Sequence, residues 1–94
     1  MKIYSFEKLE VWKESISLTK NVYSLTDSFP INENFGLTSQ LRRATVSIAS
    51  NLAEGTARFI TISYSSAMEV LNQLIISREL SYISEKDYIL VKKS

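Results

Sequence analysis

The sequence predicts an all-α protein, and three observations lead to this class. Of the 94 residues, 45% are apolar and 22% are charged, which is a globular composition. Two glycines and one proline are too few for the turns that many short strands require. Apolar residues also recur at helical spacing over long segments. A chain of this length buries a limited share of its surface, so residues 1–94 are expected to form one small domain that self-associates.

The first predicted helix runs from Ser5 to about Asp27 and carries two apolar stripes. One stripe consists of Leu9, Trp12, Ile16, Thr19 and Tyr23, and the stripe beside it consists of Val11, Ser15, Leu18, Val22 and Leu25. A single core contact needs only about half of this combined width. We therefore assign the first stripe to the core. The second stripe, with Val11, Leu18, Val22 and Leu25, is the predicted interface with another subunit.

Three further helices follow, because Phe29-Pro30 ends the first one. The second helix ends near Glu54, before Gly55 as its C′ residue, and its core stripe is Leu37, Leu41, Ala44, Ile48 and Leu52. The third covers about residues 59–80, with Ile60, Tyr64, Ala67, Val70, Leu71, Leu74 and Ile75 on its core side. The fourth is short. Ser84 is its expected N-cap with Asp87 at N3, and Ile83 and Tyr88 form a hydrophobic staple.

A polar ridge borders the apolar stripe of the second helix, and its members are Gln40, Arg43, Ser47, Asn51 and Glu54. Guanidinium and amide groups on such a ridge suit phosphates and bases. The same groups also satisfy one another across helices or subunits when they are buried. Simple solvation of the ridge is the third alternative. We favour the interhelix or intersubunit network and keep nucleic-acid binding as the rival interpretation.

Basic residues are balanced by acidic ones, 11 against 10, which gives a formal charge of +1. A nucleic-acid site must therefore be a local patch rather than the whole surface. The candidates are Arg42 and Arg43 near the start of the second helix and Arg58 after its end. An adjacent arginine pair is more often solvated or ion-paired, so this signal is weak on its own.

The sequence contains neither cysteine nor histidine. Disulfides, Cys/His zinc sites, Ser-His-Asp triads and Cys-His nucleophiles are thereby excluded. It also has no Glu-x-x-His pair and no glycine-rich phosphate loop. We expect no catalytic site, no metal, no cofactor and no small-molecule substrate. No apolar run is long enough for a signal peptide or a membrane span, so we expect a cytoplasmic protein.

Several segments together resemble the four-helix-bundle proteins encoded in 23S rRNA intervening sequences. They are FEKLEVW at residues 6–12, then Phe29-Pro30 with Glu33 and Gly36-Leu37, and QLRRATVSIASNLAEG at residues 40–55. The similarity continues to residue 84. It implies an antiparallel up-and-down four-helix bundle that assembles into a ring-shaped homopentamer of unsettled molecular role. Accessory proteins of diversity-generating retroelements are similar in fold and bind nucleic acid, which is a fold-level analogy.

The chain departs from the family pattern at two places. After Gly55 the family usually has a longer polar connection, whereas Thr56 to Phe59 lead here almost directly into the third helix. The residues absent after Ala57 or Arg58 are either deleted or unobserved. The fourth helix also ends early, so we expect it to be short or truncated.

Two functions remain open from the sequence. In the first, a homo-oligomeric ring binds structured RNA or DNA weakly through Arg42, Arg43 and Arg58, since repeated weak contacts add up. In the second, the protein is a purely structural self-assembling or protein-interaction module whose polar ridge meets no nucleic acid.

Overall fold

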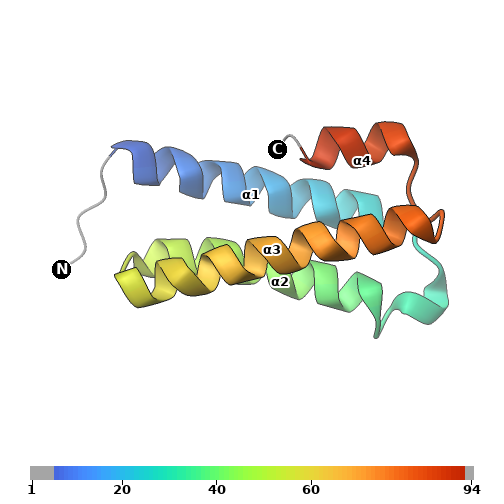
Figure 1. The fold of residues 1–94 in the computed structure, drawn as a ribbon, viewed down its shortest axis with the longest axis horizontal. Coiled ribbons are helices and arrows are strands. Elements are labelled where there is room, and N and C mark those ends of the chain that lie inside the picture. The colour runs from blue at the N-terminus through green and yellow to red at the C-terminus, as the bar shows by residue number, and fades with distance from the viewer. Residues whose placement is uncertain (1–5, 93–94) are drawn as a thin grey trace.

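The computed structural model describes residues 6–92, which form an all-helical bundle (Figure 1). Its helices are α1 (Phe6–Thr26), α2 (Leu37–Glu54), α3 (Ala57–Glu79) and α4 (Glu85–Lys92), with a 3₁₀ helix η1 (Ile31–Glu33) before α2. Consecutive α-helices run in opposite directions, so the predicted up-and-down four-helix class is confirmed. Ser5, the predicted first residue of α1, lies outside the described residues.

The turn between α2 and α3 consists of only Gly55 and Thr56. Gly55 adopts a left-handed conformation with φ of 72°, and its N–H donates to the carbonyl of Asn51 at 3.3 Å. Only glycine takes this conformation without a steric cost, which explains its place at C′. Thr56 is extended, and α3 begins at Ala57, two residues before the expected Phe59. The chain therefore joins the two helices without the longer connection of the family pattern.

Helix α2 is central, because it packs against both α1 and α3. Leu41, Ala44 and Ile48 from the predicted stripe are buried, and Leu37 and Leu52 pack at the edge of the same core. The rest of the core comes from the other elements: Val22, Phe29, Val70, Leu74, Ile83, Tyr88 and Val91. The predicted core stripe of α2 is thus confirmed.

The two stripes of α1 are buried differently from the sequence prediction, although Trp12 and Thr19 of the predicted core stripe are half-buried. Val22 is fully buried, and Leu18 and Leu25 pack against the core of the same chain. Leu9, Ile16 and Tyr23 from the predicted core stripe are instead 37–42% exposed. Val11 is 48% exposed. The predicted subunit interface is therefore mostly used inside the monomer, since contacts with α2 fix the rotation of α1.

The buried side of α3 is also more polar than its sequence predicts. Tyr64 is 69% exposed, and Ala67 is exposed as well, although both were placed in the core. The buried positions include Ser63, Ser66, Gln73 and Ser77. These small and polar side chains let α3 lie close to the polar ridge of α2.

The Glu33 carboxylate connects the start of α2 with Tyr82, which follows α3. Oε1 of Glu33 accepts the backbone N–H of Leu37 at 3.1 Å, and Oε2 accepts the hydroxyl of Tyr82 at 2.8 Å. The hydrogen bond to Glu33, together with burial and the nearby negative charge, raises the pKa of Tyr82. Gly36 leaves room for the carboxylate in this position, since a Cβ there would lie 2.5 Å from Glu33 Oε1 and the Glu33 side chain would have to shift.

Helix α4 is short, as predicted, and covers only part of α1 and α3 (Figure 1). Its N-cap is confirmed, because Ser84 Oγ accepts the N–H of Asp87 at 3.0 Å. Ile83 and Tyr88, the predicted staple pair, are both buried in the core. Arg78 of α3 lies 4.3 Å from the centre of the Tyr88 ring and 3.7 Å from Glu85.

Ser81 ends α3 in a left-handed conformation with φ of 62°. Two backbone bonds of a Schellman motif surround it, from Ser81 N to Arg78 O and from Tyr82 N to Ser77 O, both at 2.9 Å. We expect Ser81→Gly to raise the free energy of unfolding by roughly 0.5–1 kcal/mol, because glycine avoids the steric cost of this φ. Thermal and urea unfolding measure the gain. Ser81→Ala is the control and gives no such gain, and equal stability of both variants would contradict this explanation.

Candidate functional site

The contact between α2 and α3 is a polar seam built from small hydroxyl side chains. Ser63 Oγ donates to the backbone carbonyl of Ile48 at 3.0 Å, and the hydroxyls of Ser47 and Ser66 lie 2.9 Å apart. Asn51 Nδ2 donates to the carbonyl of Ser47 at 2.8 Å and to its hydroxyl at 3.1 Å. These bonds satisfy buried polar groups and fix the register of the two helices.

Gln73 extends the seam toward the first turns of α2. Its side chain is buried, and its Nε2 donates to Glu69 Oε1 at 3.0 Å and to Gln40 Oε1 at 3.4 Å. Both partners are oxygen acceptors, so the NH₂ group of the Gln73 amide must face them. The flipped amide would place its carbonyl oxygen against the Glu69 carboxylate, and the two would repel each other. Gln73 Oε1 is buried without a hydrogen-bond partner.

Three of the five ridge residues, Gln40, Ser47 and Asn51, thus hydrogen-bond within one chain. Arg43 is exposed and makes no hydrogen bond or ion pair with another residue of the described range 6–92. Glu54 is exposed in the last turn of α2. The α3 partners Ser66, Glu69 and Gln73 were not among the predicted site residues. The sequence pattern that could have predicted them is a polar stripe on one face of α3, formed by Ser63, Ser66, Gln73 and Ser77 at helical spacing.

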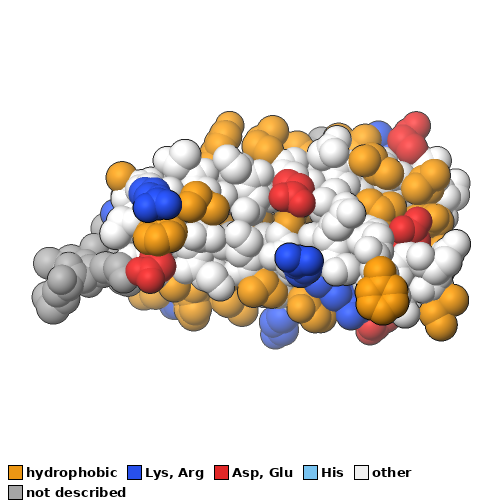
Figure 2. All heavy atoms as spheres, turned by 90° about the horizontal axis from the view of Figure 1, so that it is seen from below, with side chains coloured by type: hydrophobic (Ala, Val, Ile, Leu, Met, Phe, Trp, Pro, Cys, Tyr) orange, Lys and Arg blue, Asp and Glu red, His pale blue; other side chains and the backbone are white. Residues whose placement is uncertain are grey.

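An open groove of about 380 Å³ lies over this seam. Gln40, Arg43, Ala44 and Ser47 of α2 and Ser66 and Glu69 of α3 line it. Figure 2, which views the molecule from the side of α2 and α3, shows acidic and basic side chains near the middle of this face, on opposite sides of an uncharged strip. Further basic side chains lie toward one long edge of this face, interspersed with hydrophobic ones. A site here must therefore work through a few converging groups.

Arg42 points to the other side of α2 and is occupied by the end of α1. Its Nε donates to Thr26 Oγ1 at 2.8 Å, and one terminal nitrogen, Nη2, donates to the carbonyl of Tyr23 at 3.2 Å and to Asp27 Oδ1 at 3.0 Å. The guanidinium also lies 4.6 Å from the centre of the Tyr23 ring. A cation at a helix C-terminus is favoured by the helix dipole. We therefore assign Arg42 to holding the bundle together and remove it from the candidate nucleic-acid surface.

Arg58 lies in the first turn of α3, at the far end of α2 from Arg42. Its guanidinium is 5.8 Å from the centre of the Phe59 ring, and it forms no ion pair with a described carboxylate. At 1.5 Å per residue, the stretch from Arg43 to the end of α2 spans about 16 Å. The three predicted arginines therefore occupy three separate places.

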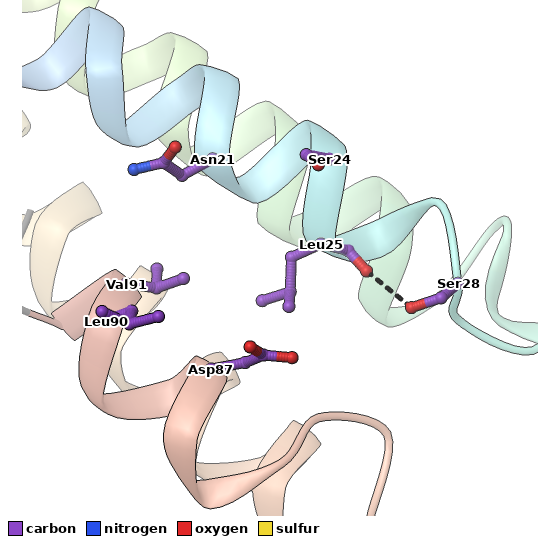
Figure 3. A pocket seen from close by; sticks show the side chains of 7 residues that line it. All are labelled: Asn21, Ser24, Leu25, Ser28, Asp87, Leu90 and Val91. Atoms are coloured by element: carbon purple, nitrogen blue, oxygen red, sulfur yellow. Dashed lines mark hydrogen bonds between the residues drawn. The ribbon is translucent and has the colours of Figure 1, made fainter.

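Two other grooves have a different chemistry. The groove between α1 and α4 has a volume of about 420 Å³ and is lined by Asn21, Ser24, Leu25, Ser28, Asp87, Leu90 and Val91, none of them basic (Figure 3). In it, Leu25 projects from α1 toward α4, and Asp87 lies on the opposite wall. A smaller groove of about 160 Å³ beside Val11 and Leu18 is mostly apolar.

Residues 6–92 contain neither a membrane-spanning helix nor a cluster of metal ligands. Every helix in this range is too short or too polar to cross a bilayer. No three acidic side chains in the same range are grouped as metal ligands would be.

Together, the up-and-down helices and the polar groove define a small helical-bundle protein whose α2–α3 seam carries the most distinctive chemistry. The family model described as "23S rRNA-intervening sequence protein" matches residues 7–94, nearly the whole chain. The chain therefore belongs to this family, as its resemblance indicated. Curated proteins offer no match to it.

The adjacent arginines of α2 provide a matched pair for testing these assignments. We expect Arg42→Ala to lower the free energy of unfolding by about 1–3 kcal/mol, because it removes charge-assisted bonds from a partly buried group. Arg43→Ala is expected to change it by less than about 0.5 kcal/mol, since the side chain is exposed and unpaired in the described range. Urea unfolding compares the two, and similar losses in both variants would contradict the assignment.

Proposed function

We propose that the protein self-associates and binds structured RNA or DNA through Arg43 and Arg58, repeated on each subunit. One observation carries the proposal. Arg43 is exposed at the edge of a polar groove and pairs with no carboxylate of residues 6–92. A guanidinium held without a partner on a rigid helix is suited to phosphates and base edges.

The charge balance favours weak binding by a single subunit. With a net charge of +1 and two separated arginines, one copy makes few phosphate contacts. Several copies held in one assembly raise the effective affinity without any new kind of contact. Oligomerisation and nucleic-acid binding therefore support each other in this proposal, and the family resemblance favours five subunits.

The exposed stripe of α1 is the proposed self-association surface. It contains Leu9, Ile16 and Tyr23, which lie on one side of the helix and are 37–42% exposed. A contiguous apolar stripe is unusual on a protein that stays monomeric. This surface takes the place of the one predicted from sequence, of which Leu18, Val22 and Leu25 pack inside the chain and Val11 stays exposed.

The second candidate function is a structural assembly module without nucleic acid. The hydrogen bonds of Gln40, Ser47 and Asn51 within the chain favour it, because they give most of the polar ridge a structural role. Arg43 distinguishes the two candidates, since the seam does not use it.

Self-association is tested by placing a charge on the exposed stripe. We expect Ile16→Glu to dissociate the oligomer, because a carboxylate buried between subunits loses its hydration without a partner. Ser17→Glu, one residue along the same helix and also exposed, is the control and leaves the assembly intact. Sedimentation velocity measures both variants and the wild type. A wild-type protein that sediments as a monomer contradicts the proposal.

Nucleic-acid binding is tested by fluorescence anisotropy with a labelled 23S rRNA hairpin and an unrelated duplex at several salt concentrations. We expect log K to fall linearly with log salt, and Arg58→Gln to reduce the magnitude of the slope by about 1 per bound site. Arg43→Gln is expected to weaken binding without unfolding the protein. Lys86→Gln on α4 is the charge-matched control. Absence of binding at low salt by the wild type would sink the nucleic-acid proposal.

A further inference from the structure

The groove between α2 and α3 holds opposite charges on its two walls. Arg43 comes from α2 and Glu69 from α3, and both line the groove without forming an ion pair with each other. A guanidinium is a donor only, and a carboxylate is an acceptor only. A ligand that fits between them must offer acceptors on one edge and donors on another.

The free hydrogen-bonding atoms of the groove can be stated one by one. Gln73 uses one oxygen of Glu69, Oε1, so Oε2 remains without a partner among the described residues. Gln73 also uses Gln40 Oε1, which leaves the Gln40 NH₂ group as a further donor on the wall of Arg43. The hydroxyls of Ser47 and Ser66 bond to each other on the floor. The α2 wall thus provides donors, and the α3 wall provides an acceptor.

The walls of the groove are rigid, and its size is adequate for a small planar ligand. Both walls are helices locked in register by the serine bonds of the seam and by the buried Gln73. Glu69 is additionally oriented by its 3.0 Å bond from Gln73. A volume of about 380 Å³ lies within the range of small-ligand sites. The two helices and Glu69 are therefore preorganised, whereas the unpaired Arg43 side chain is ordered on binding.

We infer that this groove binds an unpaired guanine base of a nucleic acid. Arg43 contacts its acceptors O6 and N7, and Glu69 accepts from its N1–H and N2 amino group. The inference rests on the proposed nucleic-acid function and assigns Arg43 to a base edge. Guanine suits the groove because its acceptors O6 and N7 lie on the Hoogsteen edge, and its donors N1–H and N2 lie on the adjacent Watson–Crick edge. Adenine, cytosine and uracil each offer fewer acceptors or fewer donors on these two edges. The base must also be unpaired, because the Watson–Crick edge of a base in a duplex is occupied.

Short uridine oligonucleotides with one central substituted base test the preference by anisotropy. The central positions compared are guanine, adenine, cytosine and uracil, in ribose and deoxyribose forms. We expect the guanine oligonucleotide to bind roughly tenfold more tightly than the others. Inosine lacks the N2 amino group, and 7-deazaguanine lacks the N7 acceptor, so each is expected to lose part of the preference. Equal binding of all four bases would overturn the inference. Comparison of the two sugars shows whether the ligand is RNA or DNA.

Arg43→Lys separates this inference from the function on which it rests. Lysine keeps the positive charge but lacks the planar fork that contacts O6 and N7 together. We therefore expect Arg43→Lys to keep the salt dependence of binding and to lose most of the roughly tenfold guanine preference. Glu69→Gln is expected to reduce the preference while its amide oxygen still accepts from Gln73. Thermal unfolding checks that both variants remain folded, and Lys86→Gln is the control with an unchanged preference.

The two proposals fail in different ways in this experiment. If all oligonucleotides bind with the same salt-dependent affinity, the nucleic-acid function stands and the guanine site is wrong. If a guanine preference exists but survives in Arg43→Lys and Glu69→Gln, the site lies elsewhere and the inference is again wrong. If neither these oligonucleotides nor the rRNA hairpin bind at low salt, both the inference and the proposed function are rejected.

Discussion

The guanidinium of Arg42 bonds to the end of α1 from the early turns of α2, and it holds that end of α1 against α2. Three polar bonds to Thr26, Tyr23 and Asp27 hold one side of α1 against α2. Val22, one turn before Thr26, then faces the core, and Leu9 and Ile16 turn outward. A charge-assisted contact at one helix end and the apolar packing of Leu18, Val22 and Leu25 thus hold α1 in the same rotation.

The opposite side of α2 is organised by neutral hydrogen bonds. Serines allow α3 to lie close, and Gln73 connects Gln40 with Glu69. This arrangement satisfies most of the polar ridge without using Arg43. Consecutive residues on a helix point about 100° apart, so Arg42 is turned toward α1 and Arg43 toward the groove over α3. Adjacent arginines of the same chemistry therefore have separate structural and surface roles.

Periodicity was sufficient to predict the helices and the core stripe of α2, and the residue types Ser84 and Asp87 predicted the cap of α4. Periodicity was insufficient for α1, because two neighbouring apolar stripes are similar in sequence, and only their packing against α2 shows which of them is buried. It also failed for Tyr64 and Ala67 on α3, since hydrophobicity alone does not show that a serine and glutamine face packs against another polar face. The ridge of the candidate site was visible in the sequence, but its α3 half depends on pairing between helices. The sequence could not show that Arg42, Arg43 and Arg58 lie in three separate places either, because this depends on how the helices pack.

The short connection through Gly55 and Thr56 also bears on the entropy of forming the fold. The cost of closing a loop grows with the logarithm of its length, so a two-residue turn brings α2 and α3 together at little cost. The bond between Glu33 and Tyr82 joins residues 49 positions apart and closes a much longer loop. Local contacts of the first kind favour rapid formation, whereas distant ones delay it. In entropic terms, the helical hairpin that carries the polar groove is the least costly part of the bundle to assemble.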